Sequence, residues 1–139
     1  MRLYFDTCYL YRVYANEPGS REVRALLQEC HHLCSSCHAR IEFSSILLRK
    51  RREGVLNSAE CQAKHAQFLQ ELEEGHLVLY PLEENIIRIV ERVMAEAPAT
   101  TFLRAADAHH LAAAAYHGFE SVYSNDRHFL AAAPLFGLT

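Results

Sequence analysis

The sequence predicts an α/β fold in which a parallel sheet carries helices on both of its faces. Short apolar segments alternate along the chain with longer segments of helical periodicity, and this alternation is typical of consecutive βαβ units. The chain has 139 residues, of which half are hydrophobic and 22% are charged, and this size and composition suit one folded domain. No repeat, low-complexity tract or linker divides it, so we expect a single domain over residues 1–139.

Four short segments are the expected strands. Residues 2–6 are apolar and aromatic and end in an acid, and residues 32–36 could form a second strand. Residues 76–82 have the clearest strand pattern, because they are rich in β-formers and are ended by Pro81. Residues 121–124 follow a turn at Gly118 and supply the fourth strand. The connections between parallel strands should be right-handed.

Six longer segments and one short C-terminal segment are the expected helices. Ser58 is the expected N-cap of the fourth helix, and Gly54 and Gly75 are expected to end the third and the fourth. The fifth helix has a strongly apolar face. The expected helices are residues 7–16, 21–30, 38–54, 58–75 and 83–97, a segment that ends near residue 117, and a last short helix after residue 126.

The composition argues against several classes of protein. A net charge of −3 gives no overall attraction to nucleic acid, so a polyanion would have to be held by a local patch or by bound cations. The N-terminal "MRLYFD" lacks the apolar segment of a signal peptide, and "LAAAAY" is too short to cross a bilayer. We therefore expect a soluble, cytoplasmic protein with no membrane partner. Its five cysteines should be free thiols: Cys8, Cys30, Cys34, Cys37 and Cys61.

Two acids stand where predicted strands end. Asp6 closes the first strand and Asp126 lies just past the fourth. Ligands of open parallel sheets bind beyond the carboxyl ends of the strands, so both acids should lie at one edge. Each also precedes a helix, where Asp is a favoured N-cap, and capping alone could explain either position.

A third acid, Asp107, lies in a segment that is otherwise alanine, leucine and histidine. We expect it inside the helix, because either threonine at positions 100–101 is a better cap, and Leu103 and Leu111 share its face. A carboxylate on such a face needs a partner, a shifted pKa or a metal. The simplest alternative is an ion pair with Arg104, three residues earlier.

Glu42 presents the same question, since its helical neighbours are His38, Ser45 and Ile46, although an ordinary solvent-facing glutamate is the alternative. Four carboxylates that converged at one edge would repel one another without cations. Oxygen-rich sites of this kind suit Mg²⁺ or Mn²⁺. Such ions can activate water and stabilise the leaving oxygen in phosphodiester hydrolysis.

Three motifs together resemble the PIN-domain nucleases, and most of all the VapC-type toxins of toxin–antitoxin pairs. They are "YFDT", in which a strand delivers an acid before a hydroxyl residue, "IEFSSIL", and "LRAADAHHLAAAAYHGFESVYSNDRHF". The last is similar to the family's C-terminal signature, with a serine where many members have threonine. The residues on its signature positions are Asp107, Gly118, Ser124, Asp126 and Phe129.

The resemblance implies a three-layer α/β/α sandwich whose central parallel sheet has four or five strands, the fifth being very short. It also implies a Mg²⁺- or Mn²⁺-dependent endoribonuclease that acts on RNA. Thr7 and Ser124 would support the site by hydrogen bonds. Homodimers and a cognate antitoxin protein are the implied partners. The implied catalytic and metal-binding residues are Asp6, Glu42, Asp107 and Asp126.

Other basic and histidine residues allow further hypotheses. The run Arg49, Lys50, Arg51 and Arg52 could contact the RNA backbone, or it could be the solvated end of a helix. His109 and His110 point in different directions on a helix, so at most one could face the site. Packing or surface exposure is the favoured interpretation for both.

Three alternative functions are weighed against the nuclease. "CHHLCSSCH", residues 30–38, contains thiols and imidazoles that suit zinc, but it lacks a second pair of ligands elsewhere. An aspartyl-phosphate phosphatase would need a second Asp at the position of Cys8. A catalytically silent PIN module that acts as an RNA-binding or protein-interaction scaffold is the remaining alternative, and metal-dependent turnover would separate it from an enzyme.

Overall fold

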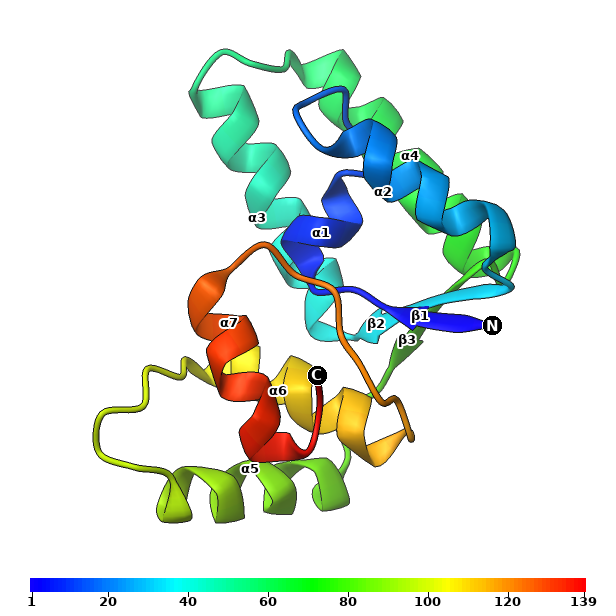
Figure 1. The fold of residues 1–139 in the computed structure, drawn as a ribbon. Coiled ribbons are helices and arrows are strands. Elements are labelled where there is room, and N and C mark those ends of the chain that lie inside the picture. Colours follow the sequence, from blue (N-terminus) through cyan, green and yellow to red (C-terminus); the bar gives the residue numbers. More distant parts are fainter.

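A parallel sheet lies at the centre of the structure, a computed structural model that describes residues 1–139 (Figure 1). Its strands are β1 (Arg2–Tyr4), β2 (His32–Ser36) and β3 (Leu77–Tyr80), in the order β1-β2-β3. The register pairs Leu3 with Leu33 and Leu33 with Leu77, which aligns three leucines across one face of the sheet. The predicted α/β class with a parallel sheet is therefore confirmed.

The segment predicted as a fourth strand joins the sheet at a single bridge. Phe5 pairs in parallel with Tyr123, whose backbone N–H donates to the carbonyl of Tyr4 (2.9 Å). On its other side, Thr139 exchanges backbone hydrogen bonds with Glu120 and Val122. The sheet thus has three strands and an extension of isolated pairs, rather than four or five full strands. The pairing is short because the chain leaves the sheet after residue 124 to begin the next helix.

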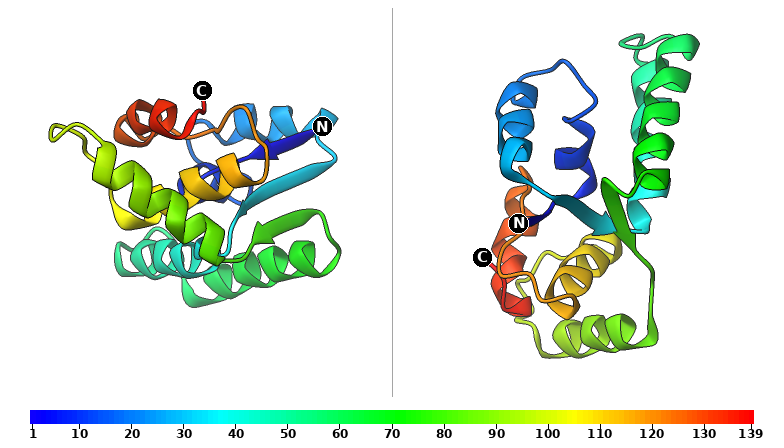
Figure 2. Two further views of the ribbon diagram at one scale, coloured as in Figure 1. Left: turned by 90° about the horizontal axis from the view of Figure 1, so that it is seen from below. Right: turned by 90° about the vertical axis from the view of Figure 1, so that its right-hand side faces the viewer.

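Helices cover both faces of the sheet, and the two further views of Figure 2 show the resulting three layers. The N-terminal layer contains α1 (Thr7–Tyr11), α2 (Ser20–Leu26) with the 3₁₀ turn η1 (Leu27–Glu29), α3 (His38–Arg52) and α4 (Ser58–Glu73). The C-terminal layer contains α5 (Glu84–Glu96), α6 (Ala105–Tyr116), α7 (Arg127–Ala132) and the 3₁₀ turn η2 (Ala133–Phe136). No helix has the length and apolar content needed to span a bilayer.

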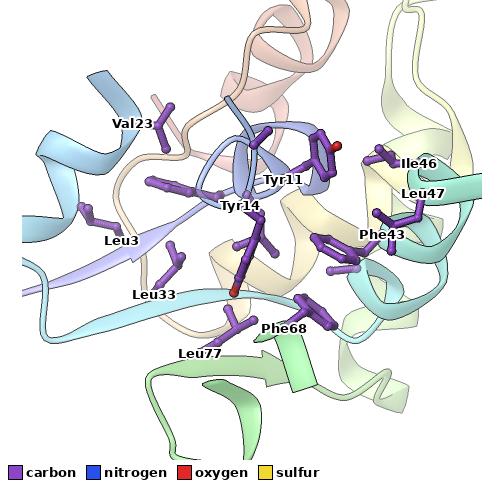
Figure 3. Close-up of a cluster of buried hydrophobic side chains, with 14 of the residues drawn as sticks. Leu3, Tyr11, Tyr14, Val23, Leu33, Phe43, Ile46, Leu47, Phe68 and Leu77 are labelled. Atoms are coloured by element: carbon purple, nitrogen blue, oxygen red, sulfur yellow. The ribbon is translucent and has the colours of Figure 1, made fainter. Parts of the chain in front are cut away.

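Alternation along β1 divides the hydrophobic core into two parts. Leu3 and Phe5 point toward the N-terminal layer, whereas Tyr4 between them packs with the C-terminal layer. Figure 3 shows the first part, in which the Phe43 and Phe68 rings stack with their centroids 4.4 Å apart. Because both faces of the sheet are buried, the strands read as apolar runs, which is why they could be predicted.

Several predicted boundaries differ from the structure. The N-cap of α4 is Asn57 rather than Ser58, and Asn57 forms a reciprocal capping box with Glu60. The first helix ends at Tyr11 instead of residue 16. Helix α6 begins only at Ala105, so neither threonine at 100–101 caps it.

Candidate acidic site at the end of β1

The four predicted acids come from four different elements that meet beyond the end of β1. Asp6 follows β1 directly and precedes α1, and Glu42 lies on the second turn of α3. Asp107 is the third residue of α6, not an interior position, and Asp126 precedes α7. The sheet, the N-terminal layer and the C-terminal layer therefore each contribute to this site.

Asp6 and Asp126 both cap helices, as the capping interpretation predicts, but each uses only one carboxylate oxygen for this purpose. Asp6 Oδ1 accepts from the N–H of Tyr9 (2.9 Å), while Oδ2 accepts from the Ser124 hydroxyl. Asp126 Oδ1 accepts from the N–H of His128 (2.8 Å), while Oδ2 faces Arg104. The second oxygen of each acid is thus directed into the shared site.

Ser124 connects these two acids. Its hydroxyl donates to Asp6 and accepts from the backbone N–H of Asp126 (3.0 Å). The bridge between Phe5 and Tyr123 places Ser124 beside Asp6, because the residues that follow a parallel pair remain adjacent. A side chain lacking the hydroxyl would leave one carboxylate oxygen of Asp6 without its donor.

Glu42 is held by two side chains from the other elements of the site. Its Oε1 accepts from the Thr7 hydroxyl (2.8 Å) and lies 2.7 Å from Nε2 of His110. Because a carboxylate only accepts, Nε2 must carry the proton of this hydrogen bond. The opposite ring atom, Nδ1, lies 3.0 Å from the Tyr4 hydroxyl. Glu42 is therefore fixed through the sheet as well as through α1 and α6.

His110 is packed, as the sequence interpretation favoured, but it also has a role in the site that this interpretation did not assign to it. It is neither surface-exposed nor merely packed, since it is 1% exposed and bonds a carboxylate of the site. Its spacing of three from Asp107 puts the two residues on one face of α6, and this spacing was the available signal. His109 instead turns to His38, with Nδ1 atoms 3.3 Å apart. Burial, together with His110 and His38, lowers the pKa of His109 to about 4.

Arg104 provides the positive charge at the outer side of the site. Its guanidinium spans two acids: Nε lies 3.4 Å from Asp107 and Nη2 lies 3.2 Å from Asp126. The alternative weighed for Asp107, an ion pair with the arginine three residues earlier, is therefore what the structure contains. Arg104 is 63% exposed in its side chain whereas Asp107 is 18% exposed, so the cation covers the acid from the solvent side.

The pKa values of the acids differ because their surroundings differ. Burial raises the pKa of Asp6 against the lowering effect of its hydrogen bonds from Ser124 and Tyr9. Burial also raises the pKa of Asp107, although Arg104 opposes the shift. For Glu42, burial is outweighed by His110 and Thr7, so that its pKa is lowered.

The basic run 49–52 and the thiols weighed above as zinc ligands lie outside this hydrogen-bonded network. Along 49–52, Lys50 pairs with Glu17 (3.3 Å), Arg49 lies 3.9 Å from Glu53, and Arg51 lines a cavity against α4. Cys30 and Cys37 stand at opposite ends of β2, which separates the thiols of the proposed zinc cluster. No group of three or more His, Cys, Asp or Glu side chains is arranged to hold a metal ion, the four acids included.

The fold and the site together define a class of α/β protein in which carboxylates gather where the first strand of a parallel sheet ends. Comparison with protein-family models identifies the class, because residues 3–134 match the PIN domain. The chain therefore belongs to the PIN domain family. PIN domains are generally nucleases, and PIN nucleases typically use divalent metals. No match was found among curated proteins.

Replacing an acid by its amide should show whether the ionised carboxylate destabilises or stabilises the fold. Asp6→Asn should raise the melting temperature at pH 7, because a folded-state pKa above the unfolded value means that ionised Asp6 destabilises the fold. The gain should shrink as the pH falls through the raised pKa and wild-type Asp6 becomes protonated. Thermal unfolding followed by circular dichroism between pH 3 and pH 8, a range of about five units that brackets ordinary carboxyl pKa values, measures this.

Asp126→Asn is the matched control with the opposite sign. Burial is outweighed by the N–H groups of Phe129 and His128 and by Arg104, so the pKa of Asp126 is lowered. The ionised form therefore stabilises the fold above the unfolded pKa, and this contribution is lost as the pH falls through the folded pKa. Asn keeps the cap, so only the charge is tested. Equal shifts of the same sign in both variants would contradict this assignment.

Proposed function

We propose that this protein is a Mg²⁺- or Mn²⁺-dependent endoribonuclease that hydrolyses RNA phosphodiesters. The observation that carries the proposal is the network of four carboxylates from four elements, held by Ser124, Thr7, His110 and Arg104. In a PIN domain, whose members are generally nucleases, such an expensive arrangement of acids is best explained by chemistry.

The donor set fits a hard divalent cation, because carboxylate oxygens are the ligands that Mg²⁺ and Mn²⁺ prefer. Asp6, Glu42, Asp107 and Asp126 would hold it after Arg104 leaves Asp107 and Asp126, because the four acids are not arranged as metal ligands in this structure. The chemistry supplied by such an ion is activation of water and stabilisation of the leaving oxygen. The chain's own contribution is positional: Ser124 orients Asp6, and Thr7 with His110 orients Glu42.

Arg104 has two roles in this proposal. Without a cation, its guanidinium balances Asp107 and Asp126. With a cation bound by these acids, the same exposed guanidinium is released and can pair with a phosphate of the RNA, for which its fork of donors is suited.

We further propose, from the resemblance to VapC-type toxins, that the protein is the toxin of a toxin–antitoxin pair, acts as a homodimer and binds an antitoxin protein. Exposed apolar side chains on α5, Ile87 and Met94, lie outside the acidic network and could serve such a dimer. Light scattering at micromolar concentration should give twice the 15.9 kDa chain mass; a monomer would remove the dimer from the proposal.

Cleavage of a structured RNA pool tests the nuclease directly. We expect cutting in Mg²⁺ or Mn²⁺ and none in EDTA, and Asp107→Asn should lose at least about a hundredfold because it removes a ligand charge with little change of shape. Ser124→Ala should lose about 10- to 100-fold through the orientation of Asp6. Equal cutting by wild type and Asp107→Asn would identify a contaminating nuclease. No cutting under any of these conditions would favour the silent scaffold.

Arg104→Gln should bind Mn²⁺ more tightly than the wild type. Exposed ion pairs are worth about 0.2–1 kcal/mol each, so the loss of two competing pairs should raise the affinity by roughly two- to thirtyfold. Isothermal titration calorimetry without RNA measures this independently of cleavage. Arg88→Gln, which removes an exposed arginine paired with Glu84 on α5, is the matched control. Weaker Mn²⁺ binding by Arg104→Gln would mean that the arginine supports the site rather than competing for it.

A further inference from the structure

We propose that a cavity beside Asp126 is a nucleobase subsite, which stacks one base of single-stranded RNA next to the phosphate held at the acids. The base would lie against the ring pair formed by Phe102 and His128. This inference rests on the nuclease function proposed above and adds to it the way in which the substrate is gripped.

The cavity has a volume of about 370 Å³ and lies between the segment that joins α5 to α6 and the last helices of the chain. This volume is within the range of about 300–1,000 Å³ that is typical of small-ligand pockets. Thr100, Thr101 and Phe102 line one wall, and His128, Ala131 and Leu135 line the other. The walls thus combine an aromatic ring, an imidazole and two hydroxyls, which can meet both the face and the edge of a base.

Phe102 is placed for contact with a ligand rather than for core packing. It is 53% exposed, and its ring lies 4.3 Å from the His128 ring between centroids, at an interplanar angle of 39°. The guanidinium carbon of Arg104 lies 5.7 Å from the centroid of the Phe102 ring. Aromatic rings, imidazoles and guanidinium planes are the groups on which unpaired bases stack.

Two direct contacts join this cavity to the acidic site. The backbone N–H of His128 donates to Asp126 Oδ1 (2.8 Å), and Nη2 of Arg104 donates to Asp126 Oδ2 (3.2 Å). Asp126 is therefore bonded through one oxygen to His128 of the ring pair and through the other oxygen to Arg104. A nucleotide whose phosphate lay near Arg104 and Asp126 would have its base within reach of Phe102.

The charge pattern favours a nucleotide over an apolar side chain as the occupant. An apolar peptide could cover Phe102, but it would bring no anion to the exposed Arg104 guanidinium when a cation takes Asp107 and Asp126. A nucleotide supplies a phosphate and a flat ring together. A second cavity contains Arg2 and Phe119, but it lies at the start of β1, the opposite end of the strand from Asp6. Of these two cavities, the one beside Asp126 is the one that couples stacking groups to the acids.

The absence of tryptophan from the chain allows a direct test. Phe102→Trp, combined with Asp107→Asn to prevent cleavage, introduces a single tryptophan at the proposed subsite. A short single-stranded RNA should quench its fluorescence, and the quenching should saturate together with the anisotropy of the same RNA carrying a terminal dye. Tyr116→Trp, an exposed aromatic position at the far end of α6, should show no quenching in the same background.

Affinity provides the second readout. In the Asp107→Asn background, Phe102→Ala should weaken binding of the dye-labelled RNA by about 5- to 100-fold, which corresponds to the loss of one stacked base. Phe102→Tyr should restore it, because the ring is kept. Circular dichroism of each variant shows whether the fold is retained.

The outcomes separate this inference from the nuclease proposal. Metal-dependent cleavage by the wild type, without quenching of Phe102→Trp and with unchanged affinity of Phe102→Ala, overturns the subsite and leaves the nuclease. Quenching and weakened binding without any cleavage by the wild type support the subsite and overturn the nuclease. If RNA does not quench the fluorescence of Phe102→Trp but a peptide does, the cavity is a peptide site and the nucleobase subsite is overturned.

Discussion

Backbone hydrogen bonds between the end of β1 and Tyr123 hold together the part of the molecule on which the acidic site depends. Tyr123 donates to the carbonyl of Tyr4, and Asp6 donates back to the carbonyl of Tyr123. This pairing fixes Ser124 beside Asp6, and the serine in turn orients the start of α7 through Asp126. One short bridge therefore sets the positions of two carboxylates that are 120 residues apart in the chain, counting from residue 6 to residue 126.

The fold tolerates four acids in one place because every one of them has compensating hydrogen-bond or ion-pair partners. Asp6 relies on a hydroxyl and a backbone N–H, and Glu42 relies on Thr7 and His110. Asp107 and Asp126 share Arg104. Asp6 and Glu42 are held by donors inside the protein. Asp107 and Asp126 depend on the exposed guanidinium of Arg104, which solvent ions or a ligand can replace. The partners of the inner acids are thus fixed, whereas the cation that balances the outer acids can be exchanged.

The sequence indicated the layers and the positions of the acids because these depend on local patterns. Apolar runs such as 2–6 and 76–82 mark strands buried on both faces, and an acid at the end of such a run must emerge at the sheet edge. The start of α6 was misjudged because nothing local distinguishes a threonine that caps from one in an extended segment. His110 was missed for another reason: its partner, Glu42, lies on a different helix, and only the packing of α3 against α6 brings them together.

The distribution of the acids between the layers has a consequence for biosynthesis. Glu42 belongs to the N-terminal layer, which is complete once β3 has been made, but Asp107 and Asp126 belong to the last third of the chain. Domains fold as their chain emerges, from the N-terminal end onward. A nascent chain that has been made only as far as β3 therefore carries two of the four carboxylates. Any chemistry that requires all four cannot begin until α7 has packed against the rest of the fold.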